Sequence, residues 1–219
     1  AVSNATAASF AGRLLKTANI AVLHNAVDLS KIDSIINSQN LKDQLGLSNK
    51  DFLFGIVGQI TPRKGQLELI KAFAKVAERT PEAKLLIVGA PIFNDDHIYQ
   101  AEIMEAVQTL GLQERVLFLG QRSDAIAIIK DIDTLIINSS SEAFVMVAIE
   151  AMACRTPVIA TDVGGTREMI EHEYHGLLVD FDDETQLIDA MTTMYADVDL
   201  RELFKVRSRE KVEKCLNAE

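Results

Sequence analysis

The chain is poor in the residues that mark secreted, metal-bound or membrane-spanning proteins. It has two cysteines in 219 residues, Cys154 and Cys215, and their wide separation is not that of a metal site. Because Cys154 lies in an apolar stretch, we expect a buried free thiol and a reducing cytoplasm. No apolar run approaches the roughly 18–20 residues of a membrane span, and residues 1–6 lack the basic start of a signal peptide. We therefore expect a cytoplasmic protein without a transmembrane segment.

Basic residues are in the minority. The 22 Lys and Arg residues against 32 Asp and Glu residues give a net charge of −10. A protein that binds nucleic acid or an anionic lipid surface neutralises phosphates with basic side chains. The composition therefore argues against nucleic acid as a main partner, and against this region binding an anionic membrane. It leaves a local basic site for a phosphate group open.

Sequence motifs for metal, nucleophilic or dinucleotide chemistry are also missing. No Ser–His–Asp arrangement and no Walker-type loop occur, and Gly58 and Gly65, with six residues between them, do not form the dinucleotide fingerprint. His172 and His175 are three residues apart, but no acidic or cysteine ligands join them, so we predict no metal site. Tandem repeats and low-complexity segments do not occur either.

From residue 52 onward, short apolar β-branched runs alternate with helical patterns. This alternation predicts an α/β fold: a doubly wound, mostly parallel sheet with helices on both faces. Ligands of such folds bind beyond the carboxyl ends of the strands, where Gly58, Gly89, Gly120 and residues 139–142 lie. The predicted strands are 52–60, 85–88, 116–119, 134–138, 157–160 and 176–179. The predicted helices are 67–79, 99–110, 124–130, 147–154, 167–170 and 184–195.

The two ends of the chain differ from the central domain, which we assign to residues 51–200. Residues 1–50 include a predicted helix at 4–16 and a short predicted strand at 20–23, but they have no core of their own and resemble a lead-in or linker. Residues 201–219 are highly charged, and we expect an exposed helix or one whose packing partner is missing. The chain lacks an initiating methionine, which favours a fragment or a processed chain.

Residues 58–65 join a predicted strand to a predicted helix and carry the adjacent cations Arg63 and Lys64. Backbone amides at the start of a helix favour an anion, and the glycines at both ends let the loop approach a ligand closely. This pattern is typical of a phosphate site. A plain turn with a solvated basic pair is the alternative, and the loop alone does not decide between them.

Two carboxylates eight positions apart, Glu142 and Glu150, flank the start of an apolar helix. A buried helix face rarely tolerates a glutamate without a partner. Glu150 is therefore either a side chain that extends to the helix edge, or a carboxylate that accepts hydrogen bonds from a diol such as ribose. Glu142 is at the least a charge that complements the helix dipole. The amides between them suit a phosphate or sugar oxygen.

These segments together resemble the nucleotide-sugar-binding half of retaining glycosyltransferases of family 4, which have the GT-B fold. The resemblance rests on Glu142 and Glu150 with seven residues between them, followed by Ala-Met-Ala-Cys-Arg-Thr-Pro-Val-Ile-Ala-Thr-Asp-Val-Gly-Gly165, and on Lys64 upstream. It spans about the whole chain from the turn at residues 25–28 onward. The resemblance identifies residues 1–50 as the remnant of an N-terminal domain and the interdomain linker, with the nucleotide-sugar-binding domain after them.

The resemblance implies transfer of a hexosyl group from a nucleotide-diphosphate sugar (linked to UDP, GDP or ADP) with retained anomeric configuration. Lys64 would contact the diphosphate, Glu150 the ribose hydroxyls, and Glu142 the transferred sugar. Positive charge and helix amides would stabilise the leaving diphosphate. The loop at Arg122 would lie against the nucleobase, a plain surface arginine being the alternative. No cofactor and no divalent metal are implied. The implied catalytic residues are Lys64 and Glu142. The implied donor-binding residues are Gly58, Gln59, Arg63, Lys64, Arg122, Phe144, Val145, Met146, Val147 and Glu150.

Four positions depart from the family pattern. Gln59 stands where an arginine is usual, and a neutral amide cannot replace its charge-assisted pair with phosphate; Arg63 is the hypothetical substitute. Val145 stands where a glycine is usual and would be strained if that position requires a positive φ. Arg155 and Ala26 also stand where smaller residues are usual. The sugar side of the site is therefore more doubtful than the nucleotide side.

The family's acceptor-binding N-terminal domain, with its catalytic-site histidine and glycine-rich loop, is not in this sequence. We therefore expect the chain to bind a nucleotide diphosphate weakly and not to turn over. The missing domain would bind the acceptor, a sugar or a lipid-linked sugar, and the intact protein could contact the inner face of the membrane peripherally. Two alternatives stay open. One is a noncatalytic nucleotide-binding module that has kept the fold, and the other is a sugar-nucleotide epimerase, against which the two-glutamate turn argues.

Overall fold

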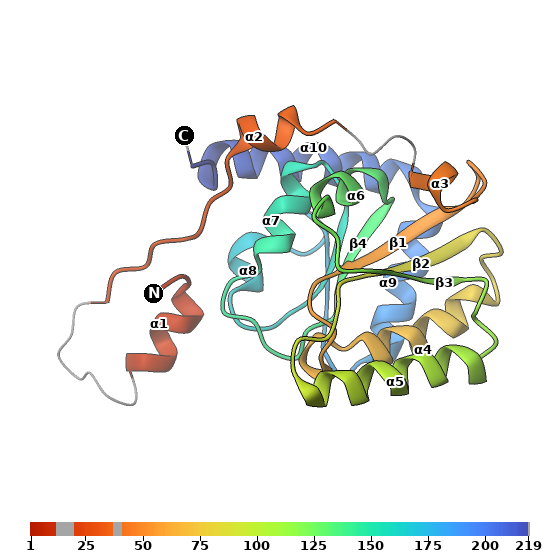
Figure 1. Cartoon of the computed structure of the whole chain (residues 1–219). Helices are drawn as coiled ribbons and strands as arrows, with labels where there is room; N and C mark the ends of the chain where they lie inside the picture. Colours follow the sequence, from red (N-terminus) through yellow and green to blue (C-terminus); the bar gives the residue numbers. More distant parts are fainter. Residues whose placement is uncertain (12–19, 37–40, 219) are drawn as a thin grey trace.

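Figure 1 shows the computed structural model of the chain, which describes residues 1–11, 20–36 and 41–218. Six parallel strands form one sheet in the order β3-β2-β1-β4-β5-β6, which confirms the predicted doubly wound sheet. The chain winds outward from β1 in both directions, so the topological switch point lies between β1 and β4. The strands are β1 (Phe52–Val57), β2 (Ala83–Val88), β3 (Val116–Gly120), β4 (Thr134–Ile137), β5 (Val158–Thr161) and β6 (Leu177–Val179).

The pairing of β1 differs on its two sides. β1 pairs with β2 along its whole length, from Phe52 opposite Ala83 to Val57 opposite Val88. It pairs with β4 only through Phe54 and Gly55. Pairing between β1 and β4 therefore stops before their carboxyl ends, and the loops that follow these two strands are placed beside each other.

The residues of β1 alternate between two cores. Phe52, Phe54 and Ile56 pack into one hydrophobic cluster, and Leu53 packs into the other. Successive side chains of a strand point to opposite faces, and a parallel sheet that is covered on both faces is apolar at successive positions. The continuous apolar pattern of this strand is the consequence.

Helices cover both faces of the sheet, which Figure 1 shows edge-on. In α4, the fully buried side chains of Leu69, Ile70 and Phe73 recur at the spacing of one helix face. One face carries α4 (Gln66–Ala77), α5 (Asn94–Thr109) and α9 (Glu184–Ala196). The other carries α2 (Leu29–Ser34), α6 (Ala125–Asp131) and α7 (Met146–Ala153), with the short helices α3 (Leu41–Gln44) and α8 (Thr166–Met169) in the same layer.

The first part of the chain packs against this domain instead of standing apart. Buried Leu29, Ile32 and Leu41 belong to the core on the α7 face. Helix α1 (Asn4–Ala11) confirms the start of the predicted helix at 4–16, whose later residues lie outside the described part. The domain boundary at residue 50 stays a prediction.

The predicted strand at residues 20–23 is wrong. The amide of Leu23 donates to the carbonyl of Ala1 over 2.8 Å, and the amino group of Ala1 donates to the carbonyl of Ala21 over 2.8 Å. This segment therefore bonds to the chain terminus instead of to a sheet edge, and the side chain of Leu23 is 81% exposed. An apolar run without a neighbouring strand has no ladder to join.

The expectation of an exposed or unpartnered C-terminal helix is also wrong. Helix α10 (Val198–Cys215) buries Phe204 in one core and Val212 in the other. Its Arg209 is 8% exposed and donates to both carboxylate oxygens of Asp33, over 2.8 and 2.7 Å, and to the carbonyl of Ala153 over 2.7 Å. Buried charges are stable when paired and hydrogen-bonded in this way.

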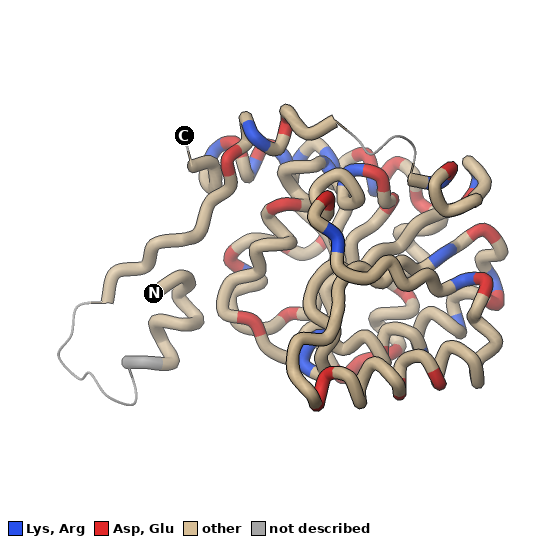
Figure 2. The backbone as a smooth tube through the Cα atoms, in the orientation of Figure 1, with Lys and Arg blue, Asp and Glu red and all other residues tan. Residues whose placement is uncertain are grey.

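The charges of the chain are spread over its surface. Figure 2 shows Lys and Arg and Asp and Glu distributed over the domain, with both signs on several helices such as α10. Among the described residues, no helix is both long and apolar enough to cross a membrane.

The second residue after α7 is strained. Arg155 has a φ of 60°, in the left-handed region, which costs a residue with a Cβ about 1–2 kcal/mol. Helices commonly end on a glycine in this conformation. We therefore expect Arg155→Gly to raise the free energy of unfolding by about 0.5–1 kcal/mol, after the entropy cost of glycine is subtracted. Urea denaturation measures this change.

Arg79→Gly is the matched control, because Arg79 is also exposed and follows a helix, but is not among the described residues with positive φ. We expect this control to lose stability. An equal gain in both variants would show that the backbone conformation of Arg155 is not the cause.

Candidate functional site

Two loops meet at the switch point, one after β1 and one after β4. The amide of Ser140 donates to the carbonyl of Arg63 over 2.9 Å, and the side-chain amide of Asn138 donates to the carbonyl of Gly65 over 2.9 Å. Gly65 has a φ of 64°, and a Cβ added there would lie 2.2 Å from the Asn138 carbonyl oxygen. Glycine is therefore required for the two loops to approach this closely.

The loop contact brings three of the predicted side chains into one ion cluster. Lys64 lies in a short 3₁₀ helix, η1 (Pro62–Lys64), and its Nζ donates to Oε1 of Glu142 over 2.6 Å. The guanidinium of Arg63 donates to the same oxygen over 3.1 Å. The side chains of Lys64 and Glu142 are 16% and 10% exposed, and that of Arg63 is 46% exposed. The cluster therefore holds two cations and one carboxylate, and Arg63 is the more exposed of the two cations.

Glu142 is ionised at neutral pH. Burial on its own raises the pKa of its carboxyl group, but the hydrogen bond from Lys64 and the charge of Arg63 outweigh burial and bring the pKa below its ordinary value. The carboxylate thus neutralises Lys64 in the free protein. An incoming phosphate would compete with Glu142 for the same ammonium group.

Helix α7 begins at Met146, four residues after Glu142 of this cluster. Val145 precedes the helix with a φ of −92°, and no side chain caps the first turn. The expected strain at Val145 is therefore absent. The tight approach falls on Gly164 instead, where an added Cβ would lie 1.6 Å from the Glu142 carbonyl oxygen. Phe144 and Val145 are buried and fix the helix start against the core.

Glu150 is the unusual residue of α7. It lies on the partly exposed side of the helix together with Met146 and Val147, while the neighbouring Ile149 and Ala151 are fully buried. Within the described parts of the chain, its carboxylate has no hydrogen-bond or ion-pair partner, and burial raises its pKa. A half-buried carboxylate without a protein partner is a group that is available to a ligand.

A separate cavity of about 230 Å³ lies beyond the carboxyl ends of β1, β2 and β3, and Gly58, Gln59 and Arg122 line it. The amide nitrogen of Gln59 donates to Asp96 over 2.6 Å, at the first turn of α5. Arg122 donates twice to Asp124, over 2.7 and 2.6 Å. The structure thus brings these three predicted residues together, but both side chains are already bonded to protein carboxylates.

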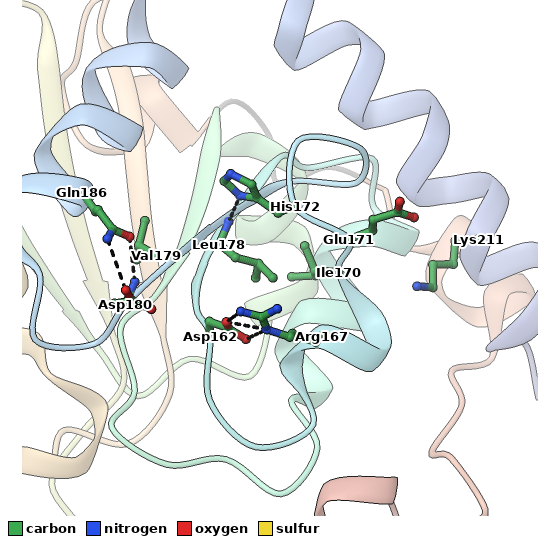
Figure 3. Close-up of a pocket in the computed structure, with 10 residues that line it drawn as sticks. All are labelled: Asp162, Arg167, Ile170, Glu171, His172, Leu178, Val179, Asp180, Gln186 and Lys211. Atoms are coloured by element: carbon green, nitrogen blue, oxygen red, sulfur yellow. Dashed lines mark hydrogen bonds and ion pairs between the residues drawn. The ribbon is translucent and has the colours of Figure 1, made fainter.

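A larger cavity, of about 620 Å³, lies beside β6 (Figure 3), and none of the predicted site residues line it. Most of its polar groups bond to one another: Arg167 pairs with Asp162, and Gln186 donates to Asp180. The switch point is the better site, because it combines an excess cation with the half-buried Glu150 beyond the carboxyl ends of β1 and β4. Nowhere in the described chain do three His, Cys, Asp or Glu side chains gather as metal ligands would, and metal independence stays a prediction.

A sequence profile described as glycosyl transferases group 1 matches residues 37–211. The chain belongs to this family. The match includes both switch-point loops, the ion cluster and Glu150, so the site described above is a site of a group 1 glycosyltransferase domain.

Named relatives agree with this assignment. The chain is 32% identical over 173 residues to N-acetyl-alpha-D-glucosaminyl L-malate synthase of Bacillus anthracis, covering 78% of this chain and 43% of the relative. It is 30% identical over 183 residues to UDP-Gal:alpha-D-GlcNAc-diphosphoundecaprenol alpha-1,3-galactosyltransferase of Escherichia coli, covering 81% and 46%. The chain therefore spans about half the length of the curated relatives that it matches.

A solved structure agrees as well. HepE of Anabaena, crystallised in complex with UDP, superposes with a TM-score of 0.87 at 28% identity, covering 99% of this chain and 59% of HepE. HepE has also been crystallised with UDP-glucose. The fold of this group 1 domain is thus the Rossmann-like half of a GT-B glycosyltransferase.

Sequence reasoning missed four residues that shape this group 1 site. Asn138 and Asp96 hold the loops after β4 and β1, and an acid in the first turn of a predicted helix was the available signal for Asp96. His24 stacks on Phe144 with ring centroids 5.4 Å apart. It also bonds to Glu168 over 3.0 Å. No local pattern indicates these last two contacts, because the partners are more than one hundred positions apart.

We expect Glu150→Gln to stabilise the free group 1 domain at pH 7. A carboxyl group whose folded-state pKa is raised stabilises the fold below its unfolded pKa, and this contribution is lost as the pH rises through the raised value. Neutral glutamine removes the cost of the ionised form. Thermal unfolding should show a higher Tm than the wild type at pH 7 and no difference below about pH 4. The same change at exposed Glu105 is the control; an equal gain there, or none at Glu150, contradicts the prediction.

We expect Val145→Gly to destabilise the domain by about 2 kcal/mol, because it removes a buried side chain and relieves no strain. Urea denaturation measures the change. A gain in stability would show that the backbone at this position favours glycine after all.

Proposed function

We propose that this chain is the donor-binding domain of a retaining glycosyltransferase of family 4. It would serve transfer of a hexosyl group from a nucleotide-diphosphate sugar to an acceptor bound by an N-terminal domain outside this sequence. The observation that carries the proposal is the ion cluster of Arg63, Lys64 and Glu142 at the topological switch point. Nucleotides bind at that point in doubly wound folds.

The cluster has the chemistry that a diphosphate requires. Lys64 and Arg63 supply two cations, and α7, whose first turn has no side-chain cap, begins four residues after Glu142; amides at a helix start favour an anion. As the glycosidic bond breaks, negative charge develops on the leaving diphosphate. Donors already fixed in place stabilise that charge without reorganisation, and the barrier falls. No metal ion is needed for this role.

Glu150 and the cavity after β1 to β3 supply the nucleoside part of the proposal. The partnerless carboxylate of Glu150 would accept hydrogen bonds from the two ribose hydroxyls. The cavity lined by Gly58 and Arg122 would take the nucleobase. Glu142, with the amides of residues 144–147, would hold the transferred sugar. The UDP and UDP-glucose complexes of HepE support a nucleotide-sugar donor.

The acceptor side of the proposal rests on the relatives. The Escherichia coli relative carries a diphosphoundecaprenol-linked substrate in its name. An acceptor sugar, or a lipid-linked sugar at the inner face of the membrane, is therefore proposed for the intact protein. The single domain is expected to bind donor weakly without turnover.

A noncatalytic nucleotide-binding module is the second candidate, and Gln59 favours it. Its amide is bonded to Asp96 over 2.6 Å and adds no positive charge to the phosphate site. Fusing a complete N-terminal domain from a relative and assaying donor hydrolysis separates the two candidates. Turnover would exclude the noncatalytic module.

We expect UDP, GDP or ADP to bind this chain, as measured by calorimetric titration of each. Lys64→Met and Glu150→Ala should each weaken the best nucleotide by about tenfold or more, because each removes a charged hydrogen-bonding group. Lys50→Met and Glu105→Ala are the matched controls. Lys50 is exposed just before the amino end of β1, and Glu105 is exposed on α5. Unchanged affinity in the two site variants, or no binding of any nucleotide, would refute the proposal.

A further inference from the structure

Glu168 holds two distant parts of the chain against the donor side of the domain. Its carboxylate accepts hydrogen bonds from the amides of Asn4 and Ala5, over 2.9 and 3.1 Å, and from the side chain of Asn4 over 2.8 Å. A fourth bond comes from Nε2 of His24 over 3.0 Å. The bonds to the amides at the start of α1 complement the helix dipole.

The surroundings of the Glu168 carboxyl group favour its ionised form. Burial on its own raises the pKa of Glu168, but the two backbone amides of Asn4 and Ala5 and the bonds from His24 and the Asn4 side chain lower it to about 2. Glu168 is 18% exposed and remains ionised under all ordinary conditions. It thus holds the N-terminal segment, residues 1–6 and 20–24, through charge-assisted bonds.

The same segment lies against the proposed donor loop, residues 142–147. The imidazole of His24 stacks on the ring of Phe144, with an interplanar angle of 21°. Ser3 is fully buried, and a Cβ added to Gly165 would lie 2.9 Å from its Cβ and 2.6 Å from the Ala143 carbonyl oxygen. The N-terminal segment, the turn at Gly165 and the donor loop are therefore packed in direct contact.

We propose that Glu168 is a positioning residue. It holds His24 against Phe144 and Ser3 against the turn at Gly165, and thereby keeps the donor loop in the geometry that binds the nucleotide sugar. The inference rests on the proposed function, because it concerns the same site. It links donor binding to the segment that precedes the domain in the sequence.

The conformational entropy of the donor loop explains why loss of Glu168 should weaken donor affinity. A loop that must be ordered when the ligand binds loses conformational entropy at that step, and the affinity falls accordingly. We propose no contact between Glu168 and the donor. A loss of affinity on its removal must therefore pass through the N-terminal segment to the loop, either by His24 on Phe144 or by Ser3 at the turn of Gly165.

The test uses the full chain and two measurements, nucleotide affinity and amide hydrogen exchange. Glu168→Ala should weaken the best-binding nucleotide by about fivefold or more and speed exchange both in residues 1–6 and in residues 142–147. Glu168→Gln keeps one acceptor oxygen and should lie between Glu168→Ala and the wild type. Glu105→Ala is the control and should match the wild type in both measurements.

Two variants of His24 test whether the effect of Glu168 reaches the donor loop through the contact of His24 with Phe144. His24→Phe keeps a ring on Phe144 without the bond to Glu168, and His24→Asn keeps a polar group without the ring. We expect the asparagine variant to lose more affinity than the phenylalanine variant, because the ring contacts the loop directly. Equal affinity of both with the wild type would overturn the role of His24.

The outcomes separate this inference from the proposed function. If the wild type binds no nucleotide, the proposed function fails, while faster exchange of residues 142–147 in Glu168→Ala still shows the coupling. If the wild type binds and Glu168→Ala binds equally well with unchanged exchange at 142–147, the positioning role is refuted. Should Glu168→Ala unfold, Glu168→Gln and the His24 variants carry the same two measurements.

Discussion

The contact between the loops after β1 and β4 is the interaction on which the rest of the site depends. A doubly wound sheet places the carboxyl ends of these strands side by side at its switch point. Gly65 lets its loop approach the backbone of Asn138 closely. The Lys64–Glu142 ion pair joins the same two loops. Gly164 supports the Glu142 carbonyl from the other side. Two glycines thus let the loops approach so closely that the Glu142 carboxylate pairs with Lys64.

The electrostatics of the chain are local and opposite to its overall charge. A chain of net charge −10 has a cluster with one excess cation at the switch point, so the proposed anionic donor would be attracted by this local charge and not by the field of the whole molecule. One turn further along α7, Glu150 stays unpaired at a cost to the free protein. Retention of a destabilising group at a ligand-binding edge is typical of functional sites, where local rules of stability are broken.

Different features of this protein were predictable to different degrees. The parallel sheet and its helices followed from the periodicity of the sequence, because local patterns decide them. The basic pair Arg63 and Lys64 and the acidic pair Glu142 and Glu150 were identified from their spacing. The packing of α10 did not, since Arg209 finds Asp33 and the Ala153 carbonyl only after the chain has folded. The strain expected at Val145 did not occur either: its φ is −92°, and the tight backbone approach falls on Gly164 instead.

The sequence by itself determined the fold class, the loop with Arg63 and Lys64, and the spacing of Glu142 and Glu150, because these features arise within a few turns or strands. Only the tertiary structure decided which groups are free and which are already bonded. It joined Gln59 to Asp96, left Glu150 without a partner among the described residues, and placed Glu168 against the N-terminal segment. The reason is that a hydrogen bond or ion pair is set by position in space, and these positions come from packing elements that are distant in sequence.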